Sequence, residues 1–152
     1  MKQNKYYQEI IERICHEIQP YAREGKQADY IPALAKVNPD QFGIYLSLMN
    51  GEDCMYGDYG TNFSIQSISK VFSLAIALSI KGKELWERIG KEPSGTAFNS
   101  LVQLEYEHGI PRNPFINAGA IVLADILLSN LENPARFFIR FVRELCGNEA
   151  ID

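Results

Sequence analysis

The chain has 152 residues, of which 46% are hydrophobic and 22% are charged, so it has the make-up of a soluble domain long enough to bury a core. Its formal net charge is -4 and it contains no run of Lys or Arg, which excludes the electrostatic attraction that dominates nucleic-acid binding. Charged residues interrupt the N-terminus before any apolar stretch is long enough for a signal peptide. The longest apolar run of the chain is far shorter than a membrane span. We therefore expect a cytoplasmic protein that binds neither nucleic acid nor membrane.

The first residues predict a helix followed by a loop. Pro20 to Gly25 should end the helix, and residues 28–40, which contain two prolines, should form a turn of helix flanked by loop, with Tyr30 at its start. Five apolar residues spaced i, i+3, i+4, i+7 and i+11 would line one face of the first helix: Tyr7, Ile10, Ile11, Ile14 and Ile18.

The next segment predicts a β-hairpin. Residues 42–49 have the pattern of a buried strand, and Asn50-Gly51 should follow it in a type I′ turn, because both residues tolerate the positive φ that this turn requires. A second strand is expected over about residues 52–59, where Gly57 begins the next turn.

The remainder of the chain predicts helices. Residues 67–82 have almost no polar face, which is typical of a buried helix, and a second buried helix is expected from about Ala118 to Leu128. Pro134 can begin the last helix. Shorter helices are expected within residues 84–90 and 99–109.

A candidate catalytic pair lies at the start of the first buried helix. Ser67 and Lys70 match the pattern S-x-x-K, and residues three apart share one face of a helix, so hydroxyl and amine can come within hydrogen-bond reach. Apolar surroundings disfavour a charged amine, and a neutral amine can accept the hydroxyl proton. Free N–H groups at the helix start, including that of Ser67, would face a developing oxyanion. Ser69 is a second hydroxyl, but Phe72 stands three residues after it.

The residues alone leave structural alternatives open. Spacing alone favours an alternative in which Ser67 is an N-cap and Lys70 is a solvated side chain. Asn117, beside small residues, could bind a polar substrate or cap the following helix. Tyr30 could point its hydroxyl into a cleft or be a half-buried packing residue, which is the commoner fate of a tyrosine. The cysteines and histidines are too widely spaced to predict a disulfide framework or a metal site.

Five stretches together resemble the serine-dependent glutaminases, in the same order and with similar spacing. They are GKQADYIPALAKVNP, GDYGTNFSIQSISKVF, GKEPSGTAFNS, NPFINAGAIV and CGNE. Residues 1–152 would then be the N-terminal portion of a glutaminase domain, with an opening helix in residues 1–25 and the matching part in residues 26–152.

The resemblance implies a fold, a reaction and a set of roles. The fold would be α+β, like that of serine β-lactamases and DD-peptidases, with a helical cluster packed on an α/β sandwich. The enzyme would be an amidohydrolase that converts L-glutamine to L-glutamate and ammonia, without metal or organic cofactor, and a homo-oligomer (dimer or tetramer). Ser67 would attack the side-chain amide, Lys70 would take the proton, and Gln66, Tyr30 and Asn117 would line the pocket, with Asn117 holding the amino-acid head.

The resemblance also implies that the fold is incomplete at the C-terminus. The family's domain is about twice as long, and its second half supplies further substrate-binding residues and the second oxyanion N–H. We expect apolar surface of the two buried helices to lie uncovered. Two other functions remain as alternatives: an inactive half-domain that acts as a binding or assembly module, and another S-x-x-K amidase or acyl transferase.

Overall fold

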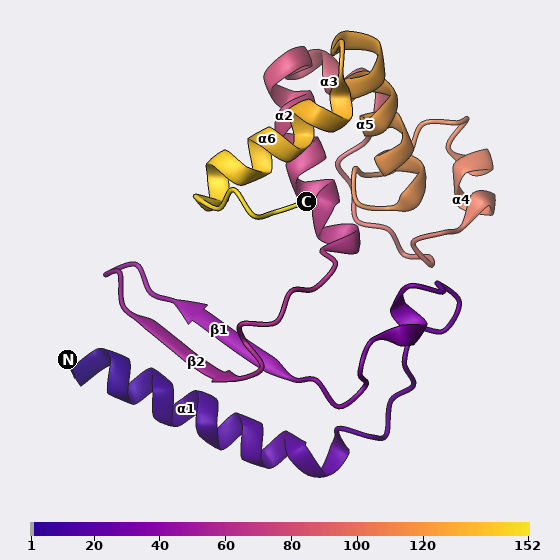
Figure 1. The fold of residues 1–152 in the computed structure, drawn as a ribbon. Helices are drawn as coiled ribbons and strands as arrows, with labels where there is room; N and C mark the ends of the chain where they lie inside the picture. The colour runs from indigo at the N-terminus through magenta and orange to yellow at the C-terminus, as the bar shows by residue number, and fades with distance from the viewer. Residues whose placement is uncertain (1) are drawn as a thin grey trace. The chain divides into compact units, whose positions relative to one another are not determined.

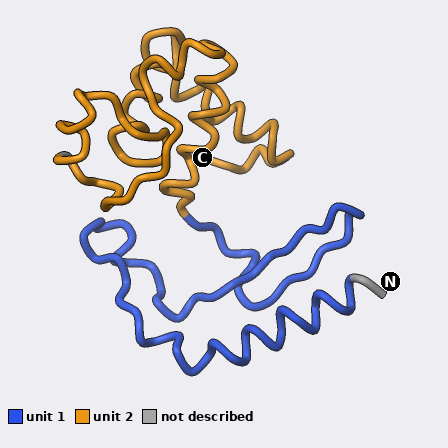
Figure 2. Tube along the Cα trace, turned by 180° about the vertical axis from the view of Figure 1, so that it is seen from behind, with its two compact units in different colours: residues 1–63 blue, residues 64–152 orange. Residues whose placement is uncertain are grey.

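The computed structural model describes residues 2–152, which form two compact units, residues 2–63 and 64–152 (Figure 2). The first unit contains α1 (Lys2–Ile18), η1 (Gln19–Tyr21), η2 (Leu34–Lys36), β1 (Gly43–Ser47) and β2 (Asp53–Gly57). The second contains η3 (Gln66–Ile68), α2 (Ser69–Lys81), η4 (Gly82–Glu84), α3 (Leu85–Arg88), α4 (Leu101–Tyr106), α5 (Asn117–Asn130) and α6 (Pro134–Cys146). Helices with one small sheet confirm the expected α+β class. In the described range no helix is long and apolar enough to cross a membrane.

In the first unit, α1 lies along the hairpin of β1 and β2 (Figure 1). Ile11 and Cys15 of the helix and Cys54 of β2 form its buried core. The predicted helix is confirmed, but its predicted apolar face is partly wrong, because Ile14 and Ile18 are exposed. Within this unit the sheet has two strands, and α1 buries Ile11 and Cys15 against it rather than Ile14 and Ile18.

The hairpin is confirmed, whereas the predicted type I′ turn is wrong. Gly51 has φ +80°, but Asn50 does not have the positive φ that this turn requires. The Leu48 N–H donates to the Glu52 carbonyl at 2.9 Å, which leaves three residues in the loop. The side chain of Asn50 explains the longer loop, because its Oδ1 accepts a hydrogen bond from the Glu52 N–H at 3.0 Å.

The strand β1 is buried less than its sequence predicts. Its residues alternate between half-buried and exposed, since α1 packs against one face of the hairpin and Tyr45 points to the other. On that other face Ser47 lies opposite Asp53. A hydrogen bond from the Tyr45 hydroxyl, and a second one from Ser47, hold the pKa of Asp53 below its ordinary value.

The second unit is a cluster of helices around α2 and α5, which lie side by side (Figure 1). Seven buried residues form its core: Ile76, Ala77, Leu85, Ile89, Leu123, Ile126 and Leu127. Both helices stand where the sequence predicts them, but neither is buried all round. Val71, Ile121 and Leu128 are 52%, 69% and 68% exposed, which confirms the expectation of uncovered apolar surface.

Gly119 allows the start of α5 to pack closely against the preceding segment. A Cβ at this position would collide with the Asn113 carbonyl and lie 2.9 Å from the Cα of Pro114. Only a residue without a side chain fits here, because the colliding atoms belong to the backbone and cannot rotate away. Close packing at Gly119 therefore fixes residues 113–116 against α5.

We predict that Gly119→Ala destabilises the protein by about 1–3 kcal/mol, because overpacking outweighs the helix propensity that alanine adds. Chemical denaturation would measure the change. Ala124→Gly, at an exposed position of the same helix, is the control for propensity and should lose only about 0.5–1 kcal/mol. A gain in stability for Gly119→Ala would contradict the packing argument.

We also predict that Tyr45→Phe raises the pKa of Asp53, because it removes the larger of the two hydrogen bonds to the carboxylate. Because the pKa of Asp53 is lower in the folded state, its carboxylate stabilises that state at pH values above about 4, the ordinary pKa of a carboxyl group. This stabilisation is lost as the pH falls through the folded-state pKa. NMR titration of the Asp53 side chain would measure the shift. Ser47→Ala should produce a smaller rise, and an unchanged pKa in both variants would refute the assignment.

Candidate active site

Ser67 lies in η3, the single 3-10 turn that leads into α2. The N-cap residue of α2 is Ile68, and neither helix start has a side-chain cap, so Ser67 is not the N-cap that spacing alone favours. Its side chain is exposed. Because Ser67 is the second residue of η3, its N–H lies in the first turn, where backbone donors have no acceptor within the helix.

Gln66, directly before Ser67, has a strained backbone. Its φ is +40°, a region that residues with a side chain rarely occupy and that costs about 1–3 kcal/mol. Strain of this kind persists where the surrounding structure imposes it, and it is concentrated at functional sites. The backbone thus marks the same turn that the S-x-x-K pattern marks in the sequence.

The Lys70 amine is held by two oxygen atoms from the segment before α5. Its Nζ donates to the Phe115 carbonyl at 2.8 Å and to the Asn117 Oδ1 at 2.9 Å. It also lies 6.0 Å from the centre of the Phe98 ring. Lys70 is therefore not a freely solvated side chain. Its hydrogen bonds within the described chain join it to Phe115 and Asn117 rather than to the Ser67 hydroxyl.

Asn117 is the first residue of α5 and not its cap, since the N-cap position belongs to Ile116. The side chain binds Lys70, while the backbone N–H of Asn117 donates to the Phe98 carbonyl at 2.9 Å. One residue thereby connects α2, α5 and the loop that carries Phe98. The alternative of a capping role for Asn117 is wrong, because its Oδ1 binds across to another helix.

Asn113 organises this segment and was missed by the sequence analysis. Its Oδ1 accepts from the N–H groups of Phe115 and Ile116 at 3.0 and 3.1 Å, and its Nδ2 donates to the Glu92 carbonyl at 3.0 Å. These bonds set the direction of the Phe115 carbonyl toward Lys70. The available signal was Asn113-Pro114, a pair typical of turns.

The structure gathers four of the five predicted site residues in the second unit. Gln66, Ser67 and Lys70 follow one another through η3 into α2, and Asn117 reaches Lys70 from α5. Tyr30 belongs to the first unit, in the loop before η2, and is 79% exposed. Its place beside the other four stays a prediction.

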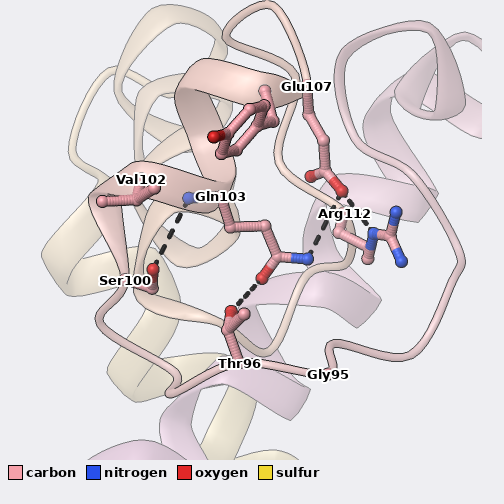
Figure 3. A pocket seen from close by; sticks show the side chains of 8 residues that line it. Gly95, Thr96, Ser100, Val102, Gln103, Glu107 and Arg112 are labelled. Atoms are coloured by element: carbon pink, nitrogen blue, oxygen red, sulfur yellow. Dashed lines mark hydrogen bonds and ion pairs between the residues drawn. The ribbon is translucent and has the colours of Figure 1, made fainter.

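A hollow of about 410 Å³ lies elsewhere in the second unit, around α4 (Figure 3). Its polar wall is a chain of side chains in which Glu107 accepts hydrogen bonds from Gln103 and Arg112. None of the predicted site residues lines it. Its lining residues are Gly95, Thr96, Ser100, Val102, Gln103, Tyr106, Glu107 and Arg112. The hollow and the predicted site residues are therefore separate features of the second unit.

Known proteins that resemble this chain are glutaminases. The family model described as Glutaminase matches residues 25–152. A glutaminase of Pseudoalteromonas translucida is 54% identical over 145 residues, which are 95% of this chain and 47% of that protein. A glutaminase of Vibrio cholerae is 56% identical over 144 residues, which are 94% of this chain and 47% of that protein. The chain spans about half the length of the curated relatives it matches.

Solved structures agree with these sequence matches. The chain superimposes on Mglu in its L-glutamate binding form with a TM-score of 0.76 and 34% identity, over 91% of this chain and 33% of that one. A probable glutaminase from Bacillus subtilis, complexed with 6-diazo-5-oxo-L-norleucine, gives a TM-score of 0.68 and 34% identity. The superposition covers 88% of this chain and 39% of that one. The expected fold is therefore confirmed, and the chain belongs to the glutaminase family.

Proposed function

We propose that this chain supplies the nucleophile and the general base of an enzyme that hydrolyses L-glutamine to L-glutamate and ammonia. The observation that carries the proposal is the Lys70 amine, held by two neutral oxygen atoms one helical turn after Ser67. Family membership supports the substrate. So do the ligands named for two structural neighbours, L-glutamate and 6-diazo-5-oxo-L-norleucine, which has a reactive diazo-ketone where glutamine has its amide.

The hydrogen bonds of Lys70 suit a base. A neutral amine has two N–H donors and one lone pair, and Phe115 and Asn117 accept the two donors. The lone pair is then left to accept the Ser67 proton. Both acceptors are uncharged oxygen atoms, so these two hydrogen bonds of Lys70 involve no carboxylate.

The reaction would proceed in two acyl-transfer steps. The Ser67 Oγ attacks the side-chain amide carbon and its proton passes to the Lys70 Nζ, while the Ser67 N–H stabilises the oxyanion. The tetrahedral intermediate collapses, and ammonia leaves with the proton from Lys70. Water then attacks the glutamyl ester, gives its proton to Lys70, and releases L-glutamate as Ser67 recovers its hydrogen. These steps need neither a metal nor an organic cofactor.

Asn117 would serve both the base and the substrate. Its Oδ1 is occupied by Lys70, which leaves the two N–H donors of its Nδ2 for the amino-acid head of glutamine. Gln66 and Tyr30 would line the same pocket. The remaining groups that bind glutamine would come from the part of the relatives that this chain does not span. A cytoplasmic location and a dimeric or tetrameric assembly belong to the same proposal.

Activity is best tested in a full-length form, in which residues 1–152 continue into the part of the Vibrio cholerae glutaminase that the chain does not match. We predict that this form releases ammonia from L-glutamine. Ser67→Ala and Lys70→Ala should each lower kcat by about a thousandfold or more, because the two residues act as a unit. The control Ser69→Ala, the neighbouring hydroxyl, should keep near-normal activity. Full activity of Ser67→Ala would refute the mechanism.

A second prediction concerns the environment of the base. In the full-length form, Asn117→Asp places a carboxylate against the Lys70 amine and so favours the ammonium form. The rising limb of the kcat/KM profile should move to higher pH. The control Asn130→Asp makes the same change at the other end of α5, roughly 20 Å away. The pH profile of Asn130→Asp should stay unchanged. If Asn117→Asp also gives the same pH profile as the unaltered enzyme, Lys70 is not the base.

A further inference from the structure

Asn50, in the loop of the hairpin, is the asparagine of this chain that a glycine follows. The chain has ten asparagines, and the other nine precede a residue with a side chain. An asparagine side chain forms a cyclic imide when the backbone nitrogen of the next residue attacks its amide carbon, and a side chain on that residue hinders the approach. Three of the nine precede proline, whose nitrogen has no hydrogen to lose. The sequence therefore favours this reaction at Asn50.

The hairpin loop holds the Asn50 amide in a defined position. Its Oδ1 accepts a hydrogen bond from the Glu52 N–H at 3.0 Å, and its Nδ2 donates to the Glu52 Oε2 at 3.2 Å. A side chain that bonds to the N–H two residues further on closes a small ring with the backbone. This ring carries the amide carbon of Asn50 past the Gly51 nitrogen, which is the attacking atom.

The Gly51 nitrogen can be approached from the side of the amide. Its N–H donates to the Leu48 carbonyl at 2.9 Å, and a hydrogen bond of this kind lies in the peptide plane and leaves the faces of the nitrogen uncovered. A Cβ at Gly51 would meet no described residue within 4 Å, its chain neighbours apart. Asn50 and Gly51 are both exposed, so water reaches the reacting atoms.

We infer that Asn50 is a site of spontaneous deamidation, which the Glu52 N–H promotes. Hydroxide takes the proton of the Gly51 nitrogen, the bond from this nitrogen to the Asn50 Cγ forms, and the Glu52 N–H stabilises the negative charge that develops on Oδ1. The Cγ–Nδ2 bond then breaks, and the nitrogen takes a proton from water and leaves as ammonia. Water opens the imide to aspartate or isoaspartate. This inference does not depend on the proposed chemistry of Ser67 and Lys70.

Deamidation would change the contacts of the loop. The product has a carboxylate oxygen where the Asn50 Nδ2 now donates to the Glu52 Oε2, so two negative charges would face one another. Isoaspartate also adds one atom to the backbone of the loop. Because loop length and turn geometry fix the register of a hairpin, the modification weakens the pairing of β1 with β2.

The experiment incubates the folded chain at mildly alkaline pH and follows each asparagine by mass spectrometry of proteolytic peptides. We predict that Asn50 converts about tenfold faster or more than Asn62 and Asn99, as stabilisation by one oxyanion donor would cause. Those two residues precede Phe63 and Ser100 and are the internal control. The rate should not depend on protein concentration, because the attacking nitrogen belongs to the same loop.

Two variants of Glu52 test the role of its N–H. Glu52→Pro removes this N–H but keeps the carbonyl that accepts from the Leu48 N–H, whereas Glu52→Ala removes the same carboxylate and keeps the N–H. We predict that Asn50 converts about tenfold more slowly or less in Glu52→Pro than in Glu52→Ala. Circular dichroism checks that both variants are folded.

A misfolded Glu52→Pro would leave the question to the unaltered chain in urea. Unfolding removes the hydrogen bond from the Glu52 N–H to the Asn50 Oδ1, so Asn50 should convert more slowly there than in the folded chain.

Three results would overturn the inference. Conversion of Asn50 no faster than that of Asn62 and Asn99 would show that it is not a preferred site. Equal rates in Glu52→Pro and Glu52→Ala, both folded, would show that the N–H does not promote the reaction. A rate that rises with protein concentration would show that another molecule, and not the loop, attacks Asn50.

Discussion

The Lys70 amine connects the parts of the second unit on which the candidate site depends. Its hydrogen bonds to the Phe115 carbonyl and the Asn117 side chain join the first turn of α2 to the first turn of α5. The bond from the Asn117 N–H to the Phe98 carbonyl adds the loop between α3 and α4. Further along both helices, residues such as Ile76 and Leu123 pack α2 and α5 into one core. Packing thus supports the site, and the amine sets its geometry.

The same junction fixes the position of the amine that we propose as the base. Both of its partners are neutral oxygen atoms, and Asn113 and Gly119 keep them in place by hydrogen bonding and close packing. A site assembled from short segments of different helices requires such supports, since each segment alone would be mobile. The strained backbone at Gln66 lies in the turn that leads into the same helix as Lys70.

Each unit leaves part of its surface uncovered. Val71, Ile121 and Leu128 leave apolar area uncovered on α2 and α5, and β1 presents an open edge. Both features agree with a chain that spans about half the length of its relatives. The second unit nevertheless has a core, because buried residues of α2 and α5 pack with Leu85 of α3, and Phe137, Phe138 and Phe141 of α6 pack against them.

The sequence by itself determined the helices, the hairpin, the family and the Ser67–Lys70 pattern, because these depend on local spacing and short motifs. Tertiary structure decided the features that depend on distant neighbours. Burial of Cys15 in place of Ile14 depends on how α1 packs against the hairpin, and the hydrogen bond of Asn117 depends on where α2 places Lys70. The positive φ of Gln66 has no local signal, since glutamine does not favour that region and only surrounding contacts can impose it.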